Sequence, residues 1–128
     1  HWHLDIALDA LKARKHVLLE KPAVHQHQEG AELYRAAKLS DRMVMVGTQQ
    51  RSGPHYKRAK EEIFAQNKLG KILFVRTAWH DFGWQARQIP DEAKPANLDW
   101  VRFLGKTPYF EYKKARYDSW RYFPEYGG

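Results

Sequence analysis

The residues best suited to chemistry are Glu20, Lys21 and Pro22, which directly follow a short apolar run at residues 16–19. An apolar run of that length that is bounded by a proline is typical of a buried strand. Ligands of open α/β sheets bind at the carboxyl ends of the strands, so Lys21 would stand at the mouth of a site, with Pro22 restraining its backbone. The alternative is a surface salt pair at a strand end, and these three residues alone do not decide between the two.

The elements that must position Lys21 alternate between helices and strands. Apolar spacing predicts helices over about residues 3–13 and 28–39, and strands over about residues 16–19 and 43–46. The run at 43–46 has no polar alternation, which predicts a strand buried on both faces, as a parallel sheet covered by helices requires. Strand, helix and strand over this distance form a right-handed βαβ unit.

A different series of elements is predicted after Gly47. Pro54 is a good first-turn residue, and the apolar spacing behind it predicts a helix over about residues 54–66. Residues 72–79 are apolar, with β-branched and aromatic members, and predict a strand of a new sheet. A long surface loop is expected over residues 81–97 and a short helix within residues 98–104.

The composition excludes some classes of function. The 128 residues include 22 Lys and Arg against 15 Asp and Glu, which gives a formal charge of +7. Such a chain suits a nucleic acid, an anionic cofactor or an anionic surface, unless it is half of a balanced protein. The basic residues are scattered and no nucleic-acid-binding signature accompanies them, so we expect no nucleic-acid partner.

Cysteine is absent, which excludes disulfides and thiolate metal sites. No apolar stretch approaches the roughly 18 residues that span a bilayer, so we expect no membrane partner. The chain opens on His1, Trp2 and His3 and runs straight into a predicted helix, so we expect the natural amino terminus to lie upstream. The cytoplasm is the default compartment, with export of the full-length protein left open.

Several short motifs stand in one order along nearly the whole chain. They are Ala10-Leu11-Lys12-Ala13, Lys15-His16-Val17, Glu20-Lys21-Pro22, Val46-Gly47-Thr48, Leu69-Gly70-Lys71-Ile72, Leu98-Asp99-Trp100, Phe103-Leu104-Gly105, and Trp120-Arg121 with Pro124, Tyr126, Gly127 and Gly128. Together they resemble the glucose-fructose oxidoreductase, inositol dehydrogenase and MocA (Gfo/Idh/MocA) family, which are NAD(P)-dependent oxidoreductases of sugars and polyols.

The resemblance implies an α/β fold in two domains. Residues 1–48 would be the C-terminal part of a Rossmann-type parallel sheet that binds NAD or NADP. Residues 49–128 would begin an α+β substrate domain with an open, mostly antiparallel sheet. The family's glycine-rich phosphate loop and its D-x-x-x-H catalytic pattern are absent from this sequence and are expected upstream and downstream. We therefore expect an interior fragment that is inactive by itself, from a protein that forms a homo-oligomer.

The resemblance also implies roles for the residues around Lys21. Lys21 would hydrogen-bond the reacting oxygen and relay its proton, since an ammonium donates three hydrogen bonds and favours developing alkoxide charge. Glu20 would accept hydrogen bonds from the nicotinamide ribose, and Pro22 would fix the turn. The peptide bond between Lys21 and Pro22 is a candidate for the cis form, which is cheap only before proline.

Residues further along the chain receive roles in the same way. His3 and Gln49 would bind the cofactor, although His3 is also compatible with a solvent-exposed residue at a helix start. Gln50 and Arg51 would bind substrate, unless Arg51 only pairs on the surface. Trp120 and Arg121 would fold over the nicotinamide half of the cofactor, where indole can stack and guanidinium can bind phosphate or amide oxygens.

Other residues invite functional interpretations that the sequence disfavours. The pairs His1 with His3 and His25 with His27 have a spacing that does not place both rings on one helical face, so we expect solvent-exposed imidazoles and no metal. Trp79, Trp84 and Trp100 are assigned to cores and not to a sugar platform. Arg14 stands where the family usually has glycine, which costs roughly 1 kcal/mol if the backbone there is left-handed.

The expected function is hydride transfer between NAD(P) and a sugar or cyclic polyol. One alternative is an NAD-dependent glycoside hydrolase of the same superfamily, whose members carry a Glu-Val-Pro type sequence in place of Glu20-Lys21-Pro22. The other alternative is a non-catalytic sugar-binding relative.

Overall fold

The computed structural model describes residues 1–78 and 89–127 of the chain. The described residues divide into two compact units. The first unit contains residues 1–46 together with residues 89–127, and the second contains residues 47–78. Among the described residues, no helix is long and apolar enough to cross a membrane.

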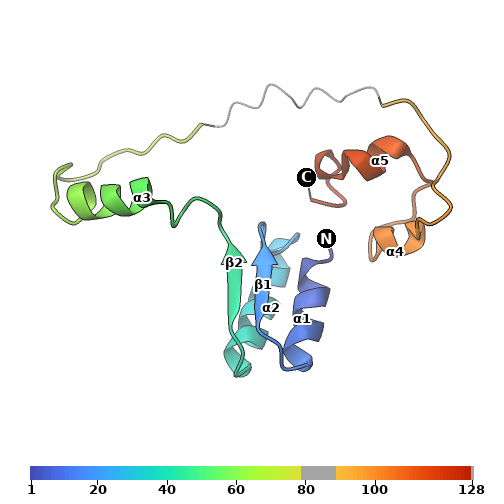
Figure 1. Ribbon diagram of the computed structural model, residues 1–128, viewed down its shortest axis with the longest axis horizontal. Helices are drawn as coiled ribbons and strands as arrows, with labels where there is room; N and C mark the ends of the chain where they lie inside the picture. The colour runs from blue at the N-terminus through green and yellow to red at the C-terminus, as the bar shows by residue number, and fades with distance from the viewer. Residues whose placement is uncertain (79–88, 128) are drawn as a thin grey trace. The chain divides into compact units, whose positions relative to one another are not determined.

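The first unit begins with the expected alternation of helices and strands. Helix α1 (His3–Lys12) precedes strand β1 (Val17–Glu20), and helix α2 (His27–Leu39) precedes strand β2 (Val44–Gly47). The two strands are hydrogen-bonded neighbours and run in the same direction (Figure 1). All four elements were predicted to within two residues at each end. The parallel βαβ unit is therefore confirmed.

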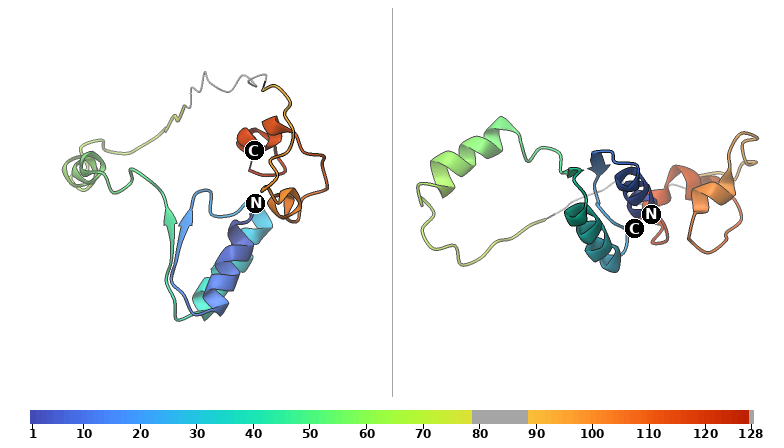
Figure 2. Two further views of the ribbon diagram at one scale, coloured as in Figure 1. Left: turned by 45° about the vertical axis from the view of Figure 1, so that its right-hand side comes forward. Right: turned by 90° about the horizontal axis from the view of Figure 1, so that it is seen from below.

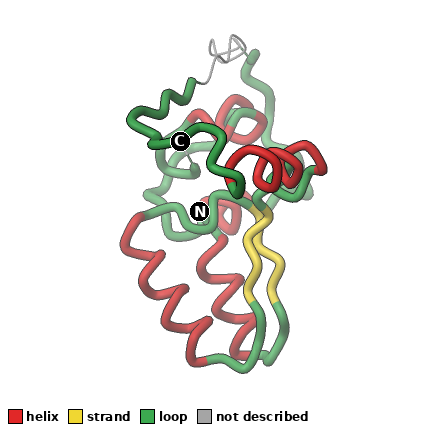
Figure 3. The backbone as a smooth tube through the Cα atoms, turned by 90° about the vertical axis from the view of Figure 1, so that its left-hand side faces the viewer, coloured by secondary structure: helices red, strands yellow, loops and turns green. Residues whose placement is uncertain are grey.

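The core of this unit lies between the sheet and its two helices. Leu4 and Ala7 of α1, Leu19 of β1 and Leu33 of α2 are buried against one another. Both helices lie on the same side of the strands (Figures 2 and 3). Burying these side chains supplies the hydrophobic stabilisation of the unit, because each removes apolar surface from water.

The prediction that residues 43–46 are buried on both faces was wrong for the described structure. Leu18 of β1 is 69% exposed, and Met43 and Met45 are 71% and 63% exposed. They alternate with more buried neighbours because successive side chains of a strand point to opposite faces. The helices cover one face of the sheet, and no described element covers the other.

The loops before and after β1 have defined backbone conformations and hydrogen bonds. Arg14 has φ 57°, so the left-handed backbone considered for this position is present. The peptide bond between Lys21 and Pro22 is cis. At the start of α2, the Glu29 carboxylate accepts hydrogen bonds from the backbone N–H groups of His25 (2.9 Å) and Gln26 (3.0 Å). Glu29 thereby caps the helix and holds the loop that follows β1.

The rest of the first unit is an aromatic cluster. It is built around α4 (Trp100–Leu104), α5 (Lys114–Asp118) and the 3₁₀ turn η2 (Trp120–Tyr122). Trp100, Leu104 and Tyr126 are buried at its centre. The Trp100 indole stacks on Phe103 at 5.0 Å and donates a hydrogen bond to the Phe110 carbonyl at 2.7 Å. Trp100 is thus a core residue, as predicted, whereas Trp79 and Trp84 lie outside the described residues.

The amino-terminal residues join the aromatic cluster to the βαβ unit. The Trp2 indole donates to the carbonyl of Arg102 at 3.1 Å, and its ring lies where a Cβ on Gly105 would approach it to 2.8 Å. Gly105 also has φ 59°, so both the backbone and the close contact require glycine there. Lys106 forms an ion pair with Asp5 of α1.

The second unit is a helix followed by an extended segment. Helix α3 (Pro54–Ala59) continues into the π-helical turn η1 (Lys60–Phe64), so the helix predicted over residues 54–66 is confirmed. The predicted strand over residues 72–79 was wrong for residues 72–78, which have no regular secondary structure, and Trp79 is not among the described residues. Ile72 to Val75 are each more than half exposed. A β-prone sequence forms a strand only when a neighbouring strand completes its hydrogen bonds, and the described residues of this unit supply none.

The remaining predictions concern the segment before α4. Residues 89–97 have no regular secondary structure, in agreement with the predicted loop, and residues 81–88 lie outside the described part of the chain. The short helix expected within residues 98–104 is α4.

Candidate functional site

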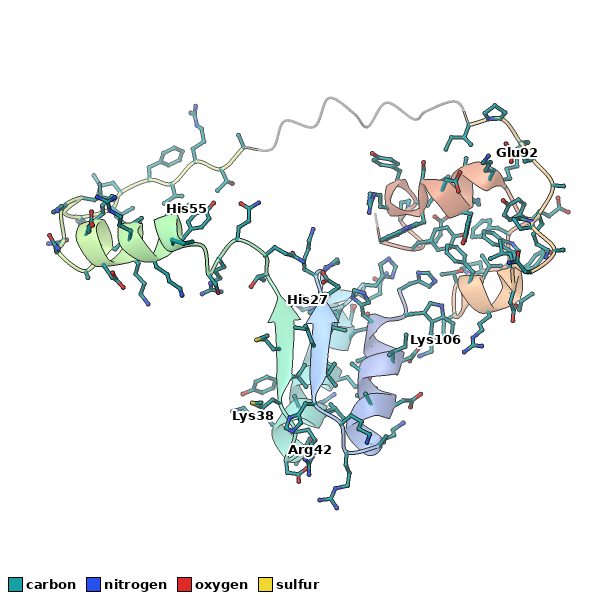
Figure 4. The ribbon with its side chains drawn as sticks, in the orientation of Figure 1. His27, Lys38, Arg42, His55, Glu92 and Lys106 are labelled. Atoms are coloured by element: carbon teal, nitrogen blue, oxygen red, sulfur yellow. The ribbon has the colours of Figure 1, made fainter. Side chains whose placement is uncertain are left out.

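A cavity of about 410 Å³ lies beside the carboxyl end of β1. It is formed within the first unit by three segments that are distant in sequence: the start of α1, the loop after β1 and the end of the described chain. The lining residues are His1, His3, Glu20, Lys21, Pro22, Val24, His25, Trp120, Arg121, Tyr126 and Gly127. Figure 4 shows His27 near this end of the sheet, whereas Lys38 and Arg42 lie at the opposite end.

Lys21 lines the cavity and is exposed. Among the described residues it makes no hydrogen bond or ion pair, so its three N–H donors are available to a ligand. Glu20 and Pro22, the residues on either side of Lys21, are exposed and also line the cavity.

His3 is oriented by the loop that carries Lys21. Its Nδ1 lies 2.6 Å from the carbonyl oxygen of Pro22. Because a carbonyl only accepts hydrogen bonds, Nδ1 must carry the proton, which leaves Nε2 of the neutral ring as an acceptor. His3 is partly buried and lines the cavity, so the alternative of a freely solvated imidazole at a helix start was wrong.

His25 ties the same loop to the end of the described chain. Its Nε2 donates to the Pro124 carbonyl at 2.6 Å, and its Nδ1 accepts from the Gln26 side-chain amide at 3.2 Å. The expectation of a solvent-exposed imidazole was wrong for His25, which is partly buried, and it was also wrong for His1, whose ring bonds the Phe103 carbonyl at 2.7 Å. No local sequence signal could have identified these contacts, since their partners lie about 100 residues away.

Trp120 and Arg121 bring an indole and a guanidinium to the cavity. The Arg121 guanidinium lies 5.1 Å from the centre of the Trp120 ring, and Trp120 remains 39% exposed. In the aromatic cluster, the Arg116 guanidinium lies 3.9 Å from the centre of the Phe110 ring and 4.6 Å from the centre of the Phe123 ring. Cation–π contacts of this kind stabilise the turn that presents Trp120 and Arg121.

The charges of the lining favour an anionic ligand. Lys21 and Arg121 are cationic, whereas Glu20 is the one carboxylate side chain among the described residues that line this cavity. A cavity of this volume is within the range of small-molecule sites, and it combines an aromatic surface with a few polar groups, as such sites do.

Gln49, Gln50 and Arg51 belong to the second unit. They line a separate depression of about 430 Å³ together with Tyr56 and Lys60. Gln50 has φ 68°, an uncommon backbone conformation for a residue other than glycine. Tyr56 and Lys60 were not singled out from the sequence, although their spacing of four residues places both on one face of the predicted helix.

The histidine pairs do not assemble a metal centre within residues 1–78 and 89–127. No group of three or more His, Cys, Asp or Glu side chains in these ranges is placed to hold a metal ion.

Comparison with known proteins gives consistent matches. Residues 1–48 match the Gfo/Idh/MocA family, described as an oxidoreductase family with an NAD-binding Rossmann fold. A levoglucosan dehydrogenase from Pseudarthrobacter phenanthrenivorans is 34% identical over 76 residues, which is 59% of this chain and 19% of that protein. An uncharacterized oxidoreductase from Synechocystis is 32% identical over 77 residues, which is 60% of this chain and 20% of that protein. One from Schizosaccharomyces pombe is 28% identical over 97 residues, which is 74% of this chain and 26% of that protein.

The chain spans about a fifth to a quarter of the length of these curated relatives. No solved structure matches the chain.

Proposed function

Because the chain belongs to the Gfo/Idh/MocA oxidoreductase family, whose members have an NAD-binding Rossmann fold, we propose that it forms part of a site for hydride transfer between NAD(P) and a sugar or cyclic polyol. The observation that carries this proposal is the position of Lys21, at the end of β1 and in the wall of a cavity shared with Trp120 and Arg121. The similarity to a levoglucosan dehydrogenase supports a carbohydrate as the substrate.

The residues of the cavity fit the nicotinamide half of a dinucleotide. The Trp120 indole can stack on a flat ring, the Glu20 carboxylate can accept hydrogen bonds from ribose hydroxyl groups, and the Arg121 guanidinium can bind a phosphate or an amide oxygen. When bound, the cofactor supplies or accepts the hydride. The lining residues are compatible with NAD and with NADP.

Lys21 is the proposed catalytic residue. In the direction of reduction, its ammonium donates a hydrogen bond to the substrate carbonyl oxygen and then the proton that the oxygen gains. In the direction of oxidation, the neutral amine takes that proton back from the hydroxyl group as the carbon loses its hydride. The hydrogen bond also stabilises the alkoxide-like charge that develops on the oxygen between these states.

The histidines hold the loop that carries Lys21. His3 bonds the Pro22 carbonyl from α1, and His25 bonds the Pro124 carbonyl in the segment that presents Trp120 and Arg121. We propose that these contacts fix the distance between the amine and the bound ring, which matters because proton transfer depends on hydrogen-bond geometry.

The proposal extends to residues after β2. Gln49 would contact the cofactor, because it follows a strand whose carboxyl end lies next to that of β1. Gln50 and Arg51 would contact the substrate. Residues 49–128 would belong to a substrate domain with an open, mostly antiparallel sheet, in a protein that forms a homo-oligomer.

Substitution of Lys21 tests the proposed function. In the full-length protein, Lys21→Ala should lower kcat by about two orders of magnitude or more, because it removes a positioned proton-transfer group. The Kd of the dinucleotide should stay within a few-fold of its original value. The rate is followed by the absorbance of the reduced cofactor on a panel of sugars, and the Kd by fluorescence titration.

Lys15→Ala is the matched control, since Lys15 is an exposed lysine just before the other end of β1. It should leave both kcat and Kd unchanged. Normal turnover of the Lys21→Ala variant would exclude Lys21 from the chemistry.

A further inference from the structure

The depression in the second unit has a lining suited to negative charge. Arg51 and Lys60 are cationic, Tyr56 offers a hydroxyl group, and none of the described residues that line the depression carries a carboxylate. Among the described residues, neither Arg51 nor Lys60 has an ion-pair partner. By contrast, the nearby Arg58 is paired with Glu62 at 2.7 Å.

The charge of the surrounding chain reinforces this lining. Residues 47–78 contain seven Lys and Arg and only two acidic residues, Glu61 and Glu62. Glu62 is paired with Arg58, and the cations of these residues outnumber the two carboxylates. An anion that enters the depression would therefore meet a positive potential from the whole unit.

Close contacts and a hydrogen bond hold the turn that carries Arg51 in one conformation. Gln50 has φ 68°, and its carbonyl accepts a 2.7 Å hydrogen bond from the N–H of Gly53. A Cβ on Gly53 would lie 2.9 Å from that carbonyl oxygen and 2.9 Å from the ring of His55, so only glycine fits. Unfavourable backbone conformations that the surrounding contacts hold in place are found preferentially at functional sites. Here such a conformation holds Arg51 beside one turn of helix that bears Tyr56 and Lys60.

We propose that this depression binds an anionic group, a carboxylate or a phosphate, on a polyhydroxylated substrate. A guanidinium pairs with either group through two parallel hydrogen bonds, and an ammonium and a phenol add further donors. The amide side chains of Gln49 and Gln50 on the same wall are suited to hydroxyl groups. The inference rests on the proposed function for the identity of the substrate, whereas the anion site itself depends only on residues of the second unit.

The test compares three ligands that differ mainly in charge. D-glucose, D-glucuronate and D-glucose 6-phosphate are titrated by calorimetry into the full-length protein saturated with NADH, so that the cofactor occupies its own phosphate-binding groups. At least one of the two anions should bind about tenfold or more tightly than glucose. The anion that binds more tightly distinguishes a carboxylate site from a phosphate site.

Single substitutions test whether the tighter binding of the anion takes place in the depression. Arg51→Gln and Lys60→Gln should each reduce the preference for the anion over glucose to within about threefold, and Lys60→Arg should retain it. Lys57→Gln is the matched control, because Lys57 is an exposed lysine of α3 that does not line the depression. Equal or undetectable binding of all three ligands, or a preference that survives both Gln substitutions, would overturn the proposal.

Failure of this proposal is distinguishable from failure of the proposed function. A protein that does not bind NADH would contradict the oxidoreductase account, and the anion preference could still be measured without cofactor. A protein that turns over neutral sugars through Lys21 with no preference for anions would contradict only the anion site.

Discussion

At the scale of single residues, Lys21 lies at the end of a strand and its ammonium is available to a ligand. It follows β1 directly, and within the described part of the chain its ammonium has no competing partner. His3 beside it is committed through Nδ1 to the Pro22 carbonyl. We therefore propose that the lysine gives a proton to the ligand and that the histidine keeps the turn in place.

Arg14 provides a residue-scale prediction about stability. Its backbone is left-handed, with φ 57°, and the one ion pair that its side chain makes with a described residue is an exposed pair with Asp41 at 3.3 Å. Because such pairs contribute little and glycine adopts this conformation without strain, Arg14→Gly should raise the free energy of unfolding by about 0.5–1 kcal/mol. Urea denaturation of the full-length protein measures the change.

Asn67→Gly is the control for Arg14→Gly. Asn67 has φ 51°, but asparagine tolerates this region better than arginine does, so the gain should be smaller. An Arg14→Gly variant that is no more stable than the original protein would show that this backbone is not strained.

At the scale of elements, the loop between β1 and α2 is the part that brings the site together. Glu29 of α2 binds two of its backbone N–H groups, His3 of α1 binds the Pro22 carbonyl, and His25 binds the carbonyl of Pro124. Three separate elements therefore hold one short loop. This explains how Lys21 can have a defined position while its side chain stays exposed.

His25 provides the prediction at this scale. Removing its hydrogen bond to Pro124 should loosen the segment with Trp120 and Arg121, so His25→Ala should weaken NADH binding several-fold while kcat changes less than threefold. His25→Gln should restore most of the affinity, because its amide can donate from a position similar to that of Nε2. Fluorescence titration and steady-state kinetics measure the two effects.

His27→Ala is the matched control for His25→Ala, since His27 is exposed at the first position of α2. It should leave NADH binding unchanged. If His25→Ala also leaves NADH binding unchanged, the bond to Pro124 has no role in the site.

At the scale of the whole molecule, the sequence predicted what local patterns determine. The spacing of Leu4 and Leu33 with their neighbours indicated the helices, and the apolar runs indicated β1 and β2. The exposure of Met45 was not predictable in this way, because burial depends on which elements cover a sheet. The extended state of residues 72–78 has the same origin, since a strand needs a partner that local sequence does not supply.

The candidate site was predictable to a smaller extent. Lys21 and its neighbours stand out because a strand end and a proline mark them. The resemblance of Trp120 and Arg121 to a family segment suggested their role, and the structure places them in the wall of the same cavity. The contacts of His25 and Arg116 are made between chain segments that meet only in the folded protein. No pattern in the sequence predicts them.

The most direct measurement is a structure of the full-length protein with NADH and an unreactive sugar analogue bound. The nicotinamide should lie in the cavity between Trp120 and the end of β1, with Lys21 Nζ about 3 Å from the oxygen that takes the place of the reacting one. A nicotinamide bound elsewhere, or an Nζ separated from that oxygen by more than about 6 Å with no bridging water, would contradict the assignment of Lys21 as the proton-transfer group.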